Sequence, residues 1–195
     1  RSTPSSSSAA SDVYKRQDGK LIGKLETSNS LYDVTCDWLE RTPIQGSVYG
    51  STNDEKNVDD FIADYLLAHK KLYPDTNKDA VNFFEEESSL RRRRAGLVFI
   101  ESYRELPLLA WPRKLISTLI ELEQSMILWR TSHARMVERM IGRRIGTGGS
   151  SGVDYLDMTT KYRVFVDLWA VRSILIKKEA LPELKNKEFY EFRGE

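Results

Sequence analysis

The chain has 195 residues, a formal net charge of +1 at pH 7 and a single cysteine, Cys36. One cysteine excludes an internal disulfide framework and is typical of a reducing compartment such as the cytoplasm, and the small net charge argues against a general polyanion binder. No run of about 18 apolar residues occurs, so the sequence predicts no transmembrane helix.

The first 17 residues, RSTPSSSSAASDVYKRQ, are rich in serine and have no helical periodicity. The string SSAASDVYKRQ resembles a translated sequencing-library adapter, so we expect residues 1–17 to be disordered adapter sequence. Residues 18–195 are then the C-terminal part of a single all-α domain, and the natural protein is expected to begin upstream of residue 18.

Helical spacing of apolar residues predicts a helix over residues 31–40, which Pro43 and Gly46 end. A second helix is predicted over 58–73, a shorter one over 80–87, and a fourth after the arginine run 91–94. Pro107 and Pro112 are expected to end that helix and restart the chain. The arginine run has no aromatic residues interleaved, so it predicts a solvated face or a subunit interface and no nucleic-acid partner.

The longest predicted helix covers residues 113–141, about eight turns at 3.6 residues per turn. Its apolar stripe, interrupted by one histidine, is Leu115, Leu119, Leu122, Met126, Trp129, His133, Met136 and Met140. Another helix is predicted over 155–176, after a glycine-rich segment. The expected architecture is therefore an all-α helical bundle with two long helices joined by a glycine-rich loop, and the tryptophans Trp111, Trp129 and Trp169 are expected to be core anchors.

His133 has two interpretations. It is a core histidine whose ring nitrogens find backbone partners, or it is a ligand of haem iron. A zinc site needs three or four protein ligands, and two histidines with one cysteine do not supply them at paired spacing. Haem needs only one protein ligand on one side, so it suits this chain better.

The segment GTGGSSG, residues 146–152, also leaves two interpretations open. It lacks the lysine and the preceding strand of a phosphate-binding P-loop. A plain connector between helices is one interpretation. Close approach of bare backbone to a ligand is the other, with Thr147, Ser150 and Ser151 supplying hydroxyls and N–H donors.

Residues 128–156, LWRTSHARMVERMIGRRIGTGGSSGVDYL, resemble the haem-binding segment of the tryptophan 2,3-dioxygenase family. The family pattern is W-R-x-x-H on a helix, then R-x-x-G, G-T-G-G-S-S-G and Y-L. The matching residues here are Trp129, Arg130, His133, Arg139, Gly142, the run 146–152, Tyr155 and Leu156. The flanking helices and WLERTP at 38–43 extend the resemblance over most of residues 30–185.

The resemblance implies a haem-dependent dioxygenase that oxidises L-tryptophan with O2 to N-formylkynurenine, the first step of tryptophan catabolism by the kynurenine pathway. The family is cytoplasmic and homotetrameric. His133 would be the proximal iron ligand, and Trp129, Gly152 and Tyr155 would contact the haem. Thr147 and Gly148 would contact the bound tryptophan.

Two departures from the family pattern are present. Asp157 stands where the family usually carries a basic residue. The family's F-x-x-x-H-Q-x-x-E motif and its carboxylate-binding arginine have no counterpart here, so no catalytic residue is assigned and this chain alone is expected to be inactive. The alternatives are a related haem enzyme acting on another indole substrate, or a cofactor-free helical interaction module.

Overall fold

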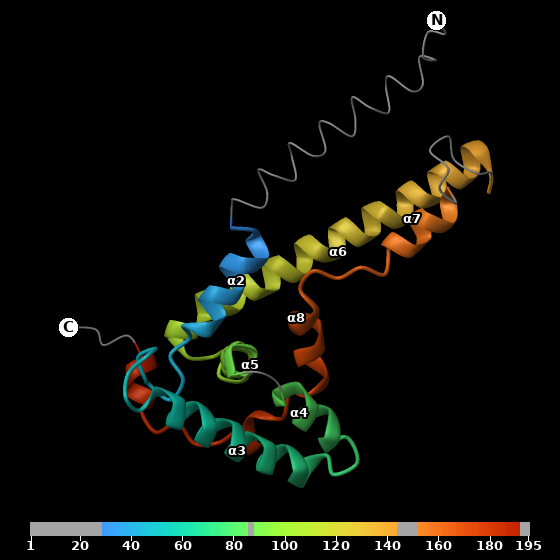
Figure 1. The fold of residues 1–195 in the computed structure, drawn as a ribbon. Coiled ribbons are helices and arrows are strands. Elements are labelled where there is room, and N and C mark those ends of the chain that lie inside the picture. The colour runs from blue at the N-terminus through green and yellow to red at the C-terminus, as the bar shows by residue number, and fades with distance from the viewer. Residues whose placement is uncertain (1–28, 86–87, 144–151, 192–195) are drawn as a thin grey trace, which may run out of the picture. The chain divides into compact units, whose positions relative to one another are not determined.

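The computed structural model describes residues 29–85, 88–143 and 152–191. These residues form helices and no strands, which confirms the all-α prediction. The helices are α2 (Leu31–Glu40), α3 (Asp54–Leu72), α4 (Asn77–Phe84), α5 (Ser88–Ser102), α6 (Pro107–Ile141), α7 (Val153–Thr159) and α8 (Val166–Ala170), followed by the short 3-10 helices η1 (Val171–Ser173), η2 (Lys178–Ala180) and η3 (Lys187–Tyr190) (Figure 1). The adapter prediction for residues 1–17 lies outside the described residues.

The chain divides into two units, residues 1–38 and 39–195, and α2 begins in the first and ends in the second. In the first unit, Ser30 and Asp33 cap α2 reciprocally. The Ser30 backbone N–H donates to Asp33 Oδ2 at 2.9 Å, and the Asp33 N–H donates to Ser30 Oγ at 3.1 Å. The predicted helix therefore starts with a capping box, and the Ser30 hydroxyl, which also donates to Asp33, lowers the pKa of that carboxyl.

The core of the second unit is an aromatic cluster between α3 and α5. Phe99 lies at its centre, with ring centroids 5.3 Å from Phe61, 4.8 Å from Tyr103 and 5.4 Å from Tyr190. Gly96 lets α5 approach residues 39–42, because a Cβ there would lie 2.5 Å from the Leu39 carbonyl oxygen. The C-terminal segment is thus packed into the same core as the two helices.

Three buried tyrosine hydroxyls fix that C-terminal segment. Tyr65 donates to the Ile174 carbonyl at 2.9 Å, and Tyr103 donates to the Pro182 carbonyl at 2.6 Å. Tyr190 donates to the Pro43 carbonyl at 2.6 Å. Burial raises the pKa of Tyr65 to about 12 and raises those of the other two tyrosines as well, so all three stay neutral donors.

Of the two prolines near the start of α6, only Pro107 acts as predicted. Pro107 is the first residue of the helix, where its missing N–H costs nothing, but α6 runs straight through Pro112. The prediction that Pro112 restarts the chain is therefore wrong. Pro112 lies close enough to the helix start for the loss of one hydrogen bond to be tolerated.

None of the described helices has both the length and the apolar character needed to cross a membrane.

The second long helix is also not formed. Residues 155–176 contain the end of α7, a non-helical connector over 160–165, α8 and η1. The N–H groups of Val164 and Phe165 donate to the Glu123 carboxylate on α6 instead of to carbonyls of their own helix. A tertiary partner therefore replaces the intrahelical hydrogen bonds, and only one long helix enters the glycine-rich segment.

Candidate functional site

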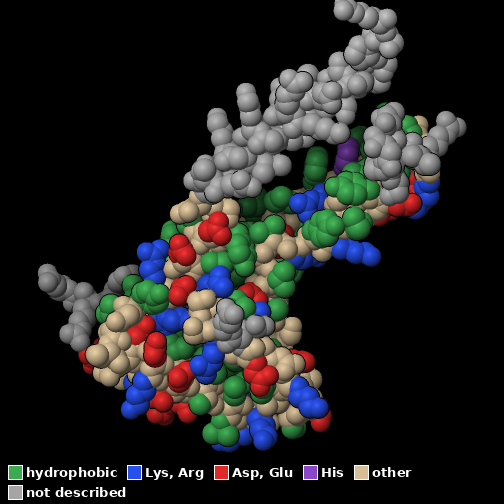
Figure 2. Space-filling view, in the orientation of Figure 1, with side chains coloured by type: hydrophobic (Ala, Val, Ile, Leu, Met, Phe, Trp, Pro, Cys, Tyr) green, Lys and Arg blue, Asp and Glu red, His purple; other side chains and the backbone are tan. Residues whose placement is uncertain are grey.

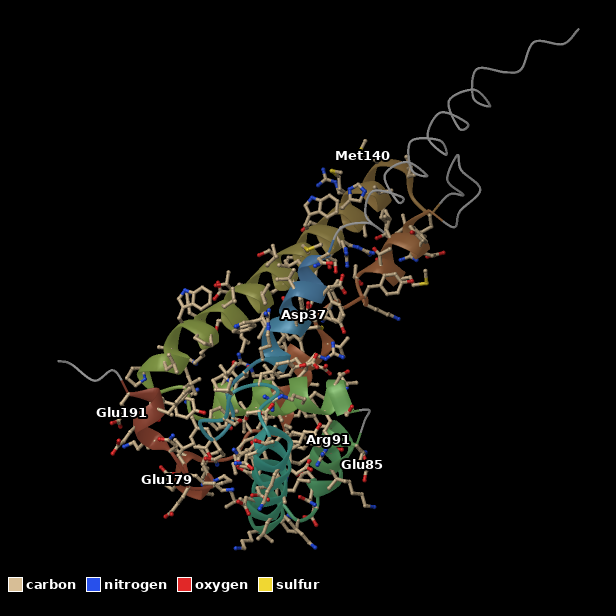
Figure 3. The ribbon with its side chains drawn as sticks, turned by 60° about the vertical axis from the view of Figure 1, so that its left-hand side comes forward. Asp37, Glu85, Arg91, Met140, Glu179 and Glu191 are labelled. Atoms are coloured by element: carbon tan, nitrogen blue, oxygen red, sulfur yellow. The ribbon has the colours of Figure 1, made fainter. Side chains whose placement is uncertain are left out.

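The apolar stripe of α6 is open over most of its length. Its first members are covered, with Leu119 buried, but Leu122, Met126, Trp129, Met136 and Met140 are all exposed. Hydrophobic side chains gather along α6 and α7 in Figure 2, whereas acidic and basic side chains are mixed over α3 and α4. Met140 projects from the end of α6 (Figure 3). The stripe is therefore a large apolar face that the described residues leave uncovered.

A different face of α6 packs against the rest of the chain. Its buried residues include Ile116, Leu119, Glu123 and Ala134. At 3.6 residues per turn, this face is centred roughly 90° around the helix from the open stripe. The prediction that Trp111 and Trp129 are core anchors is wrong, because their side chains are 68% and 66% exposed. Trp169 is partly buried and its indole N–H is bonded, as expected of an anchor.

His133 lies on the open face, partly covered. Its ring stacks on the Trp129 indole with a centroid separation of 5.4 Å and an interplanar angle of 3°. In the described part of the chain, neither ring nitrogen of His133 hydrogen-bonds to a backbone group. The backbone partners that the core-histidine interpretation requires are therefore not found within that part of the chain, and a neutral imidazole has one ring nitrogen that can accept a bond from a ligand.

The other histidine is remote from this face. His69, on α3, is buried, and its Nδ1 lies 3.3 Å from Asn77 Oδ1. Among the described residues no group of three or more histidine, cysteine or carboxylate side chains is arranged to hold a metal ion. A single imidazole on an apolar face fits a planar cofactor that takes one axial protein ligand.

Helix α7 lies side by side with the C-terminal half of α6 (Figure 1). Val153 of α7 and Ala134 of α6 are both completely buried. Gly152 is the N-cap of α7 with φ +57°, a left-handed conformation that favours glycine, and Tyr155 is half-exposed on the helix. Thr147 and Gly148, the predicted substrate contacts, lie outside the described residues.

Asp157 belongs to an ion-pair network between α6 and α7. It pairs with Arg135, and Arg143 lies 3.8 Å from it. Arg143 also pairs with Asp154 at 2.7 Å and with Glu138 at 3.0 Å. Hydrogen bonding to Asp157 raises the pKa of Arg135. The unusual acidic residue is therefore matched by Arg135 of α6 and by Arg143, which follows that helix.

Two charged residues on the packed face of α6 were missed by sequence reasoning. Glu123 is buried and accepts hydrogen bonds from residues 164–169. Arg130 donates to the carbonyl of Thr159, the last residue of α7, and to that of Tyr162 in the connector that follows. Arg130 is part of the W-R-x-x-H motif. The signal that could have indicated a role shared with Glu123 is their spacing of seven residues, which places both on one face of α6.

The arginine run is used mostly within the fold. Arg92 is buried and pairs with Asp54 at 3.0 Å. Arg94 pairs with Asp167 at 3.0 Å, and Arg91, labelled in Figure 3, pairs with Asp59. These arginines join α5 to residues from α3 and α8.

Comparison with known proteins identifies the relatives of the chain. Residues 77–175 match the family model described as tryptophan 2,3-dioxygenase. A tryptophan 2,3-dioxygenase-like protein of Xanthomonas campestris pv. campestris (strain 8004) is 60% identical over 94% of this chain and 77% of its own length.

Two further relatives are named as tryptophan 2,3-dioxygenases. The one from Sorangium cellulosum (strain So ce56) is 42% identical over 90% of this chain and 50% of its own length. Tryptophan 2,3-dioxygenase 2 of Ralstonia nicotianae (strain ATCC BAA-1114 / GMI1000) is 43% identical over 81% of this chain and 51% of its own length. The chain spans about half the length of these two relatives.

Proposed function

Because the chain belongs to the tryptophan 2,3-dioxygenase family, an enzyme family, we propose that it is the haem-ligand part of a dioxygenase that oxidises L-tryptophan. In this reaction both atoms of O2 enter across the C2–C3 bond of the indole, that bond breaks, and N-formylkynurenine forms. The observation that carries the proposal is one imidazole, His133, on an open apolar face of α6.

The residues of this face fit a haem. His133 would hold the haem iron through a ring nitrogen, and the Trp129 ring stacked on it would limit the rotation of the imidazole. Exposed Met126, Met136 and Met140 supply apolar surface for a porphyrin. When bound, the haem supplies the oxygen chemistry, and the protein contributes ligation, orientation and exclusion of water.

The substrate contacts are proposed at the glycine-rich segment and α7. Thr147 and Gly148 are proposed to bind tryptophan, because they lie in the G-T-G-G-S-S-G run that the family pattern contains. Gly152 and Tyr155, where α7 begins, are proposed to line the haem side of the site. The support for this placement is that α7 packs along the part of α6 that carries His133.

The same proposal extends to the whole protein. As in the family, we propose a cytoplasmic homotetramer that acts at the first step of the kynurenine pathway. Residues 18–195 are proposed to be one part of its single all-α domain, with residues 1–17 foreign to it.

A chimera tests the proposed function directly. Residues 30–191 of this chain replace the matching part of the Ralstonia relative, and haem uptake and N-formylkynurenine formation are measured by absorbance. The chimera is expected to bind haem and to convert tryptophan, and the chimera with His133→Ala is expected to do neither.

Two outcomes would overturn parts of the proposal. A folded chimera, checked by circular dichroism, that binds haem but oxidises only another indole would favour a related haem enzyme. A folded chimera that takes up no haem would favour a cofactor-free interaction module.

A further inference from the structure

We propose that Glu123 and Arg130 of α6 are positioning residues that hold the α7–α8 connector and thereby set where α7 lies beside His133. The inference rests on the proposed function for its catalytic meaning. The contacts themselves are independent of that function.

Glu123 gathers three N–H donors from one short stretch of chain. Its Oε1 accepts from the backbone N–H of Phe165 at 3.2 Å and from that of Val164. Its Oε2 accepts from the Trp169 indole N–H at 2.6 Å. Phe165 is the N-cap of α8, and its own side chain makes no capping hydrogen bond. The Glu123 carboxylate of α6 accepts the free N–H groups at this helix start instead. Hydrogen bonds to an ionised acceptor are roughly twice as strong as neutral ones.

Arg130 holds the other end of the connector. It lies seven residues after Glu123, on the same face of α6. Its Nη1 donates to the Thr159 carbonyl at 3.3 Å and, at 3.5 Å, to that of Tyr162. Thr159 is the last residue of α7, where carbonyls have no partner within the helix and a cation is favoured. An anion therefore holds the start of α8 and a cation the end of α7.

The connector depends on the contacts of Glu123 and Arg130 because it has little regular structure of its own. Residues 162–165 are neither helix nor strand. The ion pairs of Arg135 and Arg143 to α7 are exposed, and exposed pairs contribute little. The buried carboxylate is therefore the strong anchor, and the Arg163 guanidinium over the Trp169 ring, 5.2 Å from its centroid, adds to it.

Glu123 acts at a distance from the chemistry. It precedes His133 by ten residues, about 15 Å along an α-helix, so it does not contact the proposed haem ligand position. Its effect reaches the site through the position of α7, which carries Gly152 at its N-cap and Tyr155.

Hydrogen exchange of the Glu123→Gln chain tests whether Glu123 holds the connector between α7 and α8. The glutamine keeps the shape but loses the charge and turns one acceptor into a donor that faces another donor. Amides of residues 153–159 are expected to exchange about tenfold faster, while those of the α3 core around Phe61 and Tyr65 change by less than about twofold. The matched control is Glu121→Gln, an exposed carboxylate on the same helix, which should change neither.

A second substitution distinguishes loss of the hydrogen bonds that Glu123 accepts from simple loss of a side chain. Adding Trp169→Phe to Glu123→Gln removes the stranded indole donor, so exchange of 153–159 should slow again toward the parent value. Unchanged exchange at 153–159 in Glu123→Gln would overturn the proposal, and so would an equal rise in α3, which indicates global destabilisation.

A separate experiment tests whether Glu123 affects the proposed catalytic site. In the haem-loaded chimera with the Ralstonia relative, Glu123→Gln should raise the Kd for tryptophan, read from the change in the haem Soret band, about tenfold, with haem affinity within about twofold. A parallel loss of both affinities would contradict a positioning role. If the parent chimera does not respond to tryptophan, the proposed function fails, and hydrogen exchange of the chain still tests whether Glu123 holds the connector.

Discussion

The face of α6 that carries Ile116, Leu119 and Glu123 packs on the rest of the chain, whereas the face that carries Met126, Trp129 and Met140 is open. The open face has the stronger apolar periodicity. The packed face includes a buried carboxylate, Glu123, and a buried alanine, Ala134. The comparison teaches that a regular apolar stripe identifies a helix but does not identify the face that its own chain buries.

The largest expected difference between the faces is in folding stability. Leu119 is 5% exposed and Leu122 is 45% exposed, three residues apart on one helix. Leu119→Ala should lower the free energy of unfolding by about 2–5 kcal/mol, and Leu122→Ala by less than about 1 kcal/mol, because only the first leaves a cavity. Urea denaturation measures both. Equal losses would show that the two faces do not differ.

The next expected effect is on cofactor binding without folding. Trp129→Ala removes the ring stacked on His133 but little buried surface. Stability should stay within about 0.5 kcal/mol, while the Kd for haem should rise about tenfold. Trp111→Ala is the matched control, since that tryptophan is equally exposed near the other end of α6. A similar effect of both substitutions on haem affinity would contradict the assignment.

The smallest expected effect concerns the ion pairs between α6 and α7. Asp157→Asn removes one of the two carboxylate partners of Arg135, and because the pair is exposed the loss of stability should be small. Thermal unfolding at low and high salt measures it, and the difference from the parent protein should fade at high salt. A large loss that persists at high salt would indicate a role beyond the network.

Much of the fold follows from local sequence signals. Ser30 and Asp33 begin α2 as a capping box, and apolar spacing predicts α3, α5 and α6, although α3 begins four residues and α6 six residues earlier than predicted. Residues 155–176 were predicted as one helix because nothing local reveals that Glu123, more than 30 residues earlier, takes the N–H groups of Val164 and Phe165. Pro112 was overrated as a breaker for a related reason, since its effect depends on its distance from the helix start.

For the candidate site too, the sequence predicted some features and missed others. The motif around His133 predicts a ligand histidine, and the structure leaves that ring free of backbone hydrogen bonds within the described residues. Periodicity alone placed Trp129 in the core, because it cannot tell a buried face from an open one. The roles of Thr147 and Gly148 stay predictions.

Haem titration of the chain tests the central claim, that His133 on the open face of α6 binds haem iron, most directly. The parent chain should give a saturable histidine-ligated Soret band, which His133→Ala should lose. Trp111→Ala, which removes an exposed apolar residue near the other end of α6, should retain it. A His133→Ala chain that binds haem with the parent affinity and spectrum would contradict the account.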